Sequence, residues 1–205
     1  MGYLNLGTYL FAVAKWLLEE TSAAGYKTIH FIARDGYLVK QAYDILAAHS
    51  KKGCPKSHYF YTSRRAMMAL MIKEDGDIDS LQTMIDFRAY TPLKIIEELA
   101  PTICDELYQT KEQILLEYGI PGEQKFQTDD EWIAFAKLYK TRLYSETKNT
   151  AYRKGMKEQF QKIITPDDCT FDVGYSARTE SVLTNLLGFA VDPFYLYCNT
   201  ERGRR

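Results

Sequence analysis

The sequence lacks the features that mark several large classes of protein. Its four cysteines are far apart, and none belongs to a C-x-x-C pair or to a mixed Cys/His cluster of the kind that zinc requires. No apolar run approaches the ~20 residues of a membrane-spanning helix. The first residues show neither a basic region nor a small-residue cleavage site. We therefore expect a cytoplasmic protein with reduced thiols and no membrane span.

The chain also lacks an excess of charge of either sign. It has 26 basic and 27 acidic residues, which leave a formal net charge of -1. A balanced chain has no overall field that attracts nucleic acid or an anionic membrane, and no basic stripe is present. We expect no nucleic-acid partner, and any affinity for anions must be local. The 46% hydrophobic content indicates a folded domain with a substantial core.

Short apolar strands alternate with amphipathic helices at both ends of the sequence. Strands are expected at about 28–33, 57–62, 169–173 and 193–198, and a helix follows each of the first three. This βα order with short links predicts an α/β fold with a Rossmann-like parallel sheet. Helical periodicity predicts which side chains of the first two helices face inward. They are Leu6, Tyr9, Leu10, Val13, Trp16 and Leu17 in the first, and Leu38, Ala42, Ile45 and Leu46 in the second.

The strand pattern disappears for about ninety residues in the middle of the chain, where every segment has helical periodicity. Thr91-Pro92 is typical of an N-cap followed by proline, Pro101 is expected to open the next helix, and Thr128 with Glu131 forms the pattern of a capping box. We expect a first part of the core at 1–75, a cap-like helical insertion at 76–165 and a second part of the core at 166–205. Because no helix follows the last strand, we expect a truncated core that belongs with other domains of a longer parent protein.

Polar residues follow three of the expected strands at the point where each strand ends. They are Arg34, Asp35 and Gly36 after the first strand, Thr62, Ser63 and Arg64 after the second, and Asp172, Gly174, Ser176 and Arg178 after the third. In an open α/β sheet the carboxyl ends of parallel strands face one crevice. We therefore expect these residues to converge on one ligand.

Asp35 is the residue most suited to chemistry at these junctions. Its carboxylate could bind a metal ion, act as a general acid or base, or attack a phosphorus centre. The alternative is that Asp35 only caps the following helix, a role worth ~1 kcal/mol. The adjacent Arg34 favours function, because an anion held at a helix N-terminus gains from a guanidinium group whereas a cap does not need one.

The other two junctions have the chemistry of phosphate sites. Ser63 could donate its hydroxyl to a phosphate oxygen beside Arg64, although Ser63 is also a good N-cap. Free amides near Gly174 and Ser176, together with Arg178, would form an anion cradle next to Asp172. Neither G-x-x-x-x-G-K-[ST] nor G-x-G-x-x-G is present, so no nucleotide-binding motif supports a more specific prediction.

Histidines and tyrosines are better explained by structure than by chemistry. His30 and His58 lie inside expected strands and His49 at a helix end, and no Ser/His/Asp triad can be assembled from their spacing. The 16 tyrosines fall mostly at helical spacing, which favours packing in the core and in grooves over base stacking.

Four short stretches carry a resemblance to a known family. The runs 2–11, 31–38, 62–66 and 171–178 resemble a bacterial group of predicted hydrolases in the haloacid dehalogenase superfamily. These proteins are associated with the biosynthesis of polysaccharides and surface glycans, and the chain looks like the later module of such larger proteins.

The resemblance implies a Rossmann-like core whose first strand ends in D-x-D-G, with a nucleophilic aspartate, a second aspartate as general acid and base, a later hydroxyl, a lysine and acidic residues that hold magnesium. Asp35 and Gly36 match the second aspartate and its glycine, Thr62 or Ser63 matches the hydroxyl, and Asp172 matches a late acidic residue. The nucleophile position is occupied by Ala33, whose methyl group cannot attack phosphorus, and the lysine has no match.

Two hypotheses follow. In the first, a small phosphorylated or nucleotide-sugar type ligand is processed by a magnesium-dependent phosphohydrolase or transferase of surface glycan biosynthesis. Asp35, Asp172 and Ser63 are then catalytic, Asp35 and Asp172 hold Mg²⁺, and the substrate contacts are Arg34, Gly36, Thr62, Arg64, Gly174, Ser176 and Arg178. In the second, the chain is a non-catalytic binding or scaffolding module of a multidomain glycan-biosynthesis protein, which Ala33 favours.

Overall fold

The chain divides into two compact units. The computed structural model describes residues 2–51, 53–62, 64–174 and 178–197. An α/β unit is formed by residues 1–63 and 160–205, and a helical unit, Arg64–Gln159, is inserted between them in sequence. The helical unit begins before residue 76, the boundary expected from sequence. The reason is that Met68, on the first helix after the second strand, is buried in the core of the helical unit.

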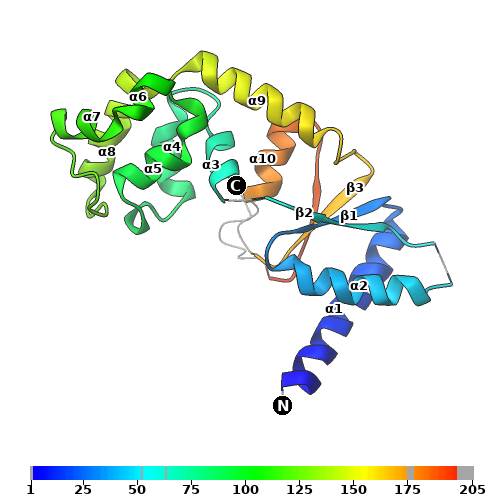
Figure 1. Cartoon of the computed structure of the whole chain (residues 1–205). Coiled ribbons are helices and arrows are strands. Elements are labelled where there is room, and N and C mark those ends of the chain that lie inside the picture. The colour runs from blue at the N-terminus through cyan, green and yellow to red at the C-terminus, as the bar shows by residue number, and fades with distance from the viewer. Residues whose placement is uncertain (1, 52, 63, 175–177, 198–205) are drawn as a thin grey trace. The chain divides into compact units, whose positions relative to one another are not determined.

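The α/β unit contains a four-stranded parallel sheet with the strand order β2-β1-β3-β4 (Figure 1). All three strand pairings are parallel, as the sequence predicted, and His30 of β1 lies opposite His58 of β2 and Thr170 of β3. The later three strands begin one residue before their expected positions. Because β2 ends at Phe60, Thr62 lies in the segment that follows this strand. The elements of this unit are α1 (Gly2–Ala24), β1 (Thr28–Ile32), α2 (Gly36–His49), β2 (Lys56–Phe60), β3 (Asp168–Asp172), α10 (Arg178–Leu187) and β4 (Asp192–Tyr195).

The two faces of this sheet have different characters. One face is apolar and packs against α1 and α2 through a core that includes Phe31, Tyr43 and Phe171. The other face mixes polar side chains such as Thr170 with apolar ones such as Phe60, whose ring contacts Phe160. It is also covered by α10, whose Glu180 accepts hydrogen bonds from Thr170 of β3 and Tyr195 of β4. Figure 1 shows α2 and α10 on opposite sides of the strands. The alternation of side chains along a strand produces this separation.

The first two helices form where periodicity predicted them, but their buried faces are partly different. In α1 the predicted Leu6 and Tyr9 are 51% and 47% exposed, and burial begins only at Val13. In α2 the predicted Leu38 and Ile45 are exposed, whereas Val39 and Tyr43 are buried. The prediction of inward positions was therefore wrong for these four side chains and for Trp16, which is 37% exposed. In α2 a second apolar stripe, with Val39 and Tyr43, faces the sheet instead, whereas the buried Val13 and Leu17 of α1 belong to the predicted face.

The helical unit has its own apolar core, built around aromatic side chains such as Trp132 and Phe135. Outside its helices the described residues form one isolated antiparallel bridge, between Ile103 and Tyr144. The elements of the helical part of the chain are α3 (Arg64–Met71), α4 (Asp77–Met84), η1 (Phe87–Ala89), α5 (Pro92–Glu98), η2 (Ala100–Thr102), α6 (Asp105–Gln109), α7 (Lys111–Glu117), α8 (Asp129–Leu138), the π-helical turn η3 (Tyr139–Leu143) and α9 (Glu146–Phe160).

Two of the predicted helix starts are confirmed in the helical unit. Thr91 accepts a hydrogen bond from the Lys94 amide at the start of α5. Thr128 accepts one from the Glu131 amide, and Glu131 reaches back to the Thr128 amide to complete the capping box of α8. Pro101 does not open an α-helix as expected, because it lies inside the short 3₁₀ turn η2.

None of the described helices combines the length and the apolar character that crossing a membrane requires.

Candidate functional site

The strand order places a topological switch point between β1 and β3. The chain leaves β1 through α2 toward β2 on one side, and leaves β3 through α10 toward β4 on the other. Because the two helices cover opposite faces of the sheet, they diverge at the carboxyl ends of these adjacent strands. In open α/β sheets this is where ligands bind. Asp35 follows β1 and Asp172 ends β3, so both acids belong to this edge.

Asp35 occupies the N-cap position of α2 without acting as a cap. Its backbone is helical, with φ -70° and ψ -27°, and its side chain makes no capping hydrogen bond. The side chains of Asp35 and of the neighbouring Arg34 are exposed. The capping interpretation therefore does not explain this aspartate, and its carboxylate is open to solvent at the predicted edge.

Asp172 is held in place by the turn that follows β3. Its carboxylate accepts a hydrogen bond of 2.9 Å from the amide of Gly174, and the residue is half-buried. A Cβ atom at Gly174 would lie 3.2 Å from one carboxylate oxygen of Asp172 and 3.3 Å from the other. The absence of a side chain at Gly174 thus permits the tight turn that orients Asp172.

Gly36 has a packing role. A Cβ atom there would lie 3.2 Å from backbone and side-chain atoms of Phe31, so the glycine allows α2 to start close against the end of β1. This packing accounts for the glycine without a contact to a substrate.

Thr62 is the described hydroxyl at the end of β2. It lies two residues beyond Phe60, which pairs with Ile32 of β1. Its Oγ1 atom is buried and has no hydrogen-bond partner among the described residues. Because an unpaired buried hydroxyl is costly, a partner from a ligand or a water molecule would stabilise it.

The remaining predicted contacts are located only in part. Ser63 and Ser176 lie outside the described residues. Arg64 begins α3, and Arg178 is half-buried at the first position of α10. Asp35, Asp172 and Thr62 therefore lie at or just after the carboxyl ends of three adjacent strands, which are β1, β3 and β2.

The described side chains offer carboxylate oxygens to a magnesium ion only in small groups. Within the described ranges, no group of three or more His, Cys, Asp or Glu side chains is arranged to hold a metal ion. Mg²⁺ is commonly held by one or two carboxylates together with water molecules and substrate phosphates. Asp35 and Asp172 have the right oxygen chemistry for such a site, in which the ligand would supply the remaining oxygens.

Glu180 is an acid near this edge that sequence reasoning missed. It is 4% exposed and accepts hydrogen bonds from Thr170 (3.2 Å) and from the Tyr195 hydroxyl (2.7 Å). Burial raises its pKa, and the charge of Asp172 acts in the same direction. Its position in the sequence could have revealed it: Glu180 lies three residues before the apolar Leu183, which is fully buried, and hence on the buried face of α10.

His30 and His58 contact each other on one face of the sheet, away from the strand ends that carry the predicted site. The Nδ1 atoms of His30 and His58 are 3.0 Å apart. Nε2 of His30 lies 3.4 Å from a carboxylate oxygen of Asp168, within ion-pair range but not aligned as a hydrogen bond. Burial lowers the pKa of both imidazoles. Burial by itself would raise the pKa of Asp168. Hydrogen bonds from Thr165 and the proximity of His30 outweigh this effect and leave the pKa below its usual value.

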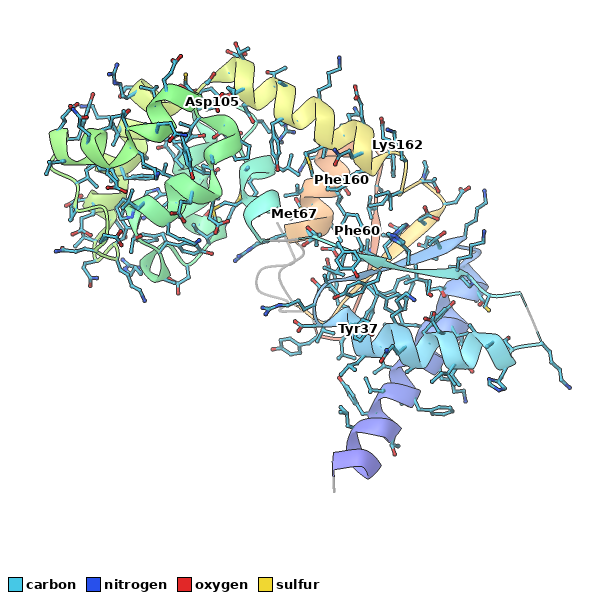
Figure 2. The ribbon with its side chains drawn as sticks, in the orientation of Figure 1. Tyr37, Phe60, Met67, Asp105, Phe160 and Lys162 are labelled. Carbon is cyan, nitrogen blue, oxygen red and sulfur yellow. The ribbon has the colours of Figure 1, made fainter. Side chains whose placement is uncertain are left out.

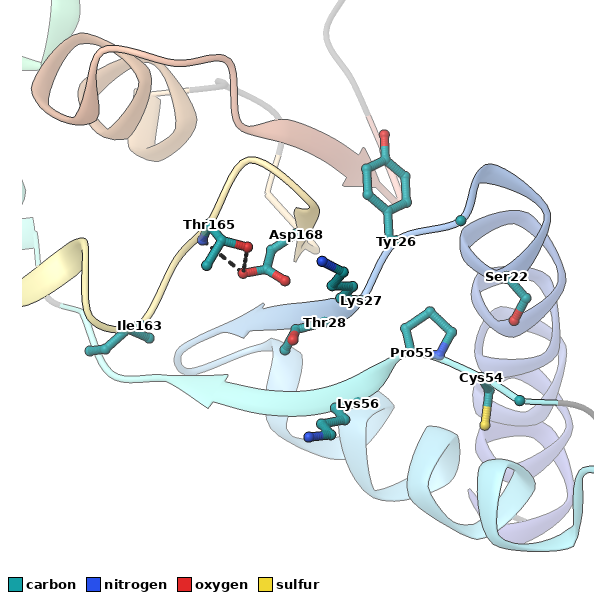
Figure 3. Close-up of a pocket in the computed structure, with 12 residues that line it drawn as sticks. Ser22, Tyr26, Lys27, Thr28, Cys54, Pro55, Lys56, Ile163, Thr165 and Asp168 are labelled. Carbon is teal, nitrogen blue, oxygen red and sulfur yellow. Dashed lines mark hydrogen bonds between the residues drawn. The ribbon is translucent and has the colours of Figure 1, made fainter.

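A cavity of about 620 Å³ lies at the opposite, amino-terminal edge of the sheet (Figure 3). Its lining includes Thr28, Lys56 and Asp168, which are at the starts of β1, β2 and β3. None of the predicted site residues lines it. Asp168 is already engaged by Thr165, as Figure 3 shows. We favour the carboxyl edge as the functional site, because parallel sheets bind ligands there.

No protein-family model matches the chain, and no curated protein matches it either. The resemblance to haloacid dehalogenase hydrolases therefore rests on the short sequence motifs alone.

Proposed function

We propose that the α/β unit binds a small phosphorylated molecule at the carboxyl ends of β1 and β3 and acts on its phosphate group. The reaction would be a hydrolysis or a transfer of the phosphoryl group, supported by Mg²⁺ between Asp35 and Asp172. This is the activity implied by the resemblance to the haloacid dehalogenase superfamily. A role in the biosynthesis of surface glycans is part of the same proposal.

The observation that carries the proposal is the state of Asp35. A carboxylate at a helix start is usually explained by capping, but Asp35 makes no capping bond and is exposed at the switch point of the sheet. An exposed acid that makes no capping bond, at the same sheet edge as a second acid on the adjacent strand, is well suited to hold a metal ion or to move a proton.

The neighbouring residues have complementary roles in this proposal. The buried hydroxyl of Thr62 would donate to a phosphate oxygen, and the exposed guanidinium of Arg34 would neutralise phosphate charge. Gly174 would act indirectly, because its amide orients Asp172. Asp35 would serve as general acid or base. A nucleophile is not supplied by Ala33, so a water molecule or an acceptor hydroxyl would attack the phosphorus.

The second candidate function is binding without catalysis. It is favoured by Ala33, which has a methyl group where the related hydrolases carry their nucleophile, and by the lack of a three-ligand metal cluster among the described side chains. In this case the same edge would hold a phosphorylated ligand for another domain.

An assay of phosphate release tests the two candidates. The wild-type chain is incubated with a panel of sugar phosphates, nucleoside phosphates and nucleotide sugars, with Mg²⁺ and with EDTA. Magnesium-dependent release of phosphate from at least one compound supports the enzyme. Binding without release, seen as an increase in melting temperature with added ligand, supports the binding module.

The variant Asp35→Asn connects the result to the site. It should abolish turnover or magnesium-dependent binding and leave the melting temperature within ~1 °C of wild type, because no capping bond is lost. Asp86→Asn is the matched control, since Asp86 is also exposed and precedes a helical turn without capping it. Wild-type activity in Asp35→Asn, or a panel that neither reacts nor binds, would refute the proposal.

A further inference from the structure

Three tyrosines form a contiguous aromatic surface where β2 ends and α2 begins. The ring centroids of Tyr37 and Tyr59 are 5.5 Å apart, and those of Tyr59 and Tyr61 are 4.8 Å apart. Both pairs are close to perpendicular, at 74° and 85°. We refer to Tyr37, Tyr59 and Tyr61 as the tyrosine ladder. Figure 2 shows Tyr37 at the start of α2.

Core packing does not account for this ladder. Tyr61 is 82% exposed and Tyr37 is 48% exposed, whereas a core tyrosine such as Tyr43 is fully buried. Tyr61 therefore lies outside the core, and its ring packs only on the neighbouring Tyr59 among the described aromatic contacts. Only Tyr59, which is partly buried, packs against the apolar core of the α/β unit.

The ladder is nevertheless ordered by its contacts. Tyr59 anchors it to the core and contacts both neighbours edge to face, a geometry that aromatic rings prefer. The Tyr37 hydroxyl accepts a hydrogen bond of 2.9 Å from the Gln41 side chain, one turn along α2. Tyr37 and Tyr61 are nevertheless left open to solvent, at 48% and 82% exposure. Rings that are fixed in place yet open to solvent are suited to stacking on a ligand.

The position of the ladder connects it to the candidate phosphate site. Tyr61 directly precedes Thr62, and Tyr37 is the second residue after Asp35. Both tyrosines therefore belong to the carboxyl edge of the sheet, where the proposed phosphate site lies. The ladder presents π faces, on which a planar aromatic ring can stack, and three phenolic hydroxyls, of which that of Tyr37 is bonded to Gln41.

We propose that the tyrosine ladder stacks on the base of a nucleotide whose phosphate occupies the carboxyl edge of β1 and β3. The natural ligand is then a nucleoside phosphate or a nucleotide sugar, and a simple sugar phosphate would bind less tightly. This inference rests on the proposed function, because it assigns the substrate class of the same site.

Calorimetric titrations with three probes test the assignment. Uridine 5′-monophosphate and adenosine 5′-monophosphate carry a base and a phosphate, whereas glucose 1-phosphate carries only the phosphate and a sugar. In the presence of Mg²⁺, both nucleotides should bind the wild-type chain more tightly than glucose 1-phosphate. Tyr61→Ala should weaken the binding of the nucleotides by about 5- to 150-fold, the range that corresponds to base–aromatic stacking. The same variant should leave glucose 1-phosphate within twofold of wild type.

Two further variants control for fold and location. Tyr61→Phe keeps the ring and should retain nucleotide affinity. Tyr118→Ala removes a tyrosine of the helical unit that is 53% exposed and should change nothing. Equal affinity of Tyr61→Ala and wild type for the nucleotides, or an equal loss for all three probes, would overturn the inference.

The titrations also separate this inference from the proposed function. If glucose 1-phosphate binds in an Asp35-dependent way and Tyr61→Ala has no effect on nucleotides, the phosphate site stands and the ladder is refuted. If Tyr61→Ala weakens nucleotides while Asp35→Asn does not, the ladder binds bases and the proposed role of Asp35 is refuted. Binding of none of the three probes to the wild-type chain overturns both.

Discussion

The imidazoles of His30 and His58 contact each other across the β1–β2 pairing, with their Nδ1 atoms 3.0 Å apart. A single proton can bridge these two nitrogens. A second proton would place two N–H donors face to face, and His30 is only 1% exposed. The pair is therefore compatible with the fold only while at least one ring stays neutral.

Acid should destabilise the fold through this pair. Burial lowers the pKa of both histidines below the usual value of 6.5, and the charge of Lys40 adds to the effect on His58. The unfolded chain therefore binds more protons than the folded chain just below pH 6.5. The contribution of the pair to the free energy of unfolding should be fully present above that pH and should decrease as the pH falls through it. Urea denaturation at a series of pH values from 8 to 5 measures this decrease.

The variant His58→Gln should show a weaker pH dependence between pH 6.5 and 5 than the wild-type chain. His49→Gln is the control, because His49 is an exposed residue at the end of α2 that bonds only its own helix. An unchanged pH dependence in His58→Gln would mean that the buried pair does not control acid stability.

Glu180 should have the opposite pH dependence. Burial raises its pKa above 4.5, so its contribution to stability is full below pH 4.5 and is lost as the pH rises through the folded-state pKa. Glu180→Gln removes the buried charge and retains groups that can bond Thr170 and Tyr195. We expect the variant to be at least as stable as wild type at pH 7 in urea denaturation, with a smaller advantage at pH 4. A loss of more than about 1 kcal/mol at pH 7 would show that the charged form is favoured by its hydrogen bonds.

Neighbouring positions on α8 should differ sharply in their contribution to stability. Phe135 is fully buried and contacts Trp132, with ring centroids 5.8 Å apart, whereas Ile133 is 59% exposed. Phe135→Ala should cost about 3–5 kcal/mol of unfolding free energy, because it leaves a cavity in a packed core. Ile133→Ala should cost less than about 1 kcal/mol. Denaturation followed by the fluorescence of the buried Trp132 compares the two, and similar losses would contradict the core described for the helical unit.

Helix α2 was predicted in position but not in orientation. Its apolar periodicity predicted a helix, and a helix forms at Gly36–His49. The inward face could not be assigned, because the spacing of Leu38 and Ile45 is as helical as that of Val39 and Tyr43. Contact decided between them: the Tyr43 ring packs on Phe31 at 5.6 Å, and its hydroxyl donates to the Pro55 carbonyl.

The candidate site was likewise predicted only in part. The junctions that carry Asp35 and Asp172 could be predicted, because a strand followed directly by a helix is a local pattern. That Asp35 leaves its helix uncapped could not be predicted, since the capping preference of aspartate argues for the opposite. Glu180 and the exposed ladder position of Tyr61 were also missed, because burial depends on which elements cover a residue.

The sequence by itself determined the parallel α/β class, the helical insertion and the capped starts of α5 and α8, because these depend on short-range periodicity and on bonds between residues a few positions apart. Only the tertiary structure decided that His30 contacts His58, that β1 and β3 are neighbours and that Glu180 is buried between α10 and the sheet. These contacts depend on strand order and register, which are set by packing between segments far apart in the chain.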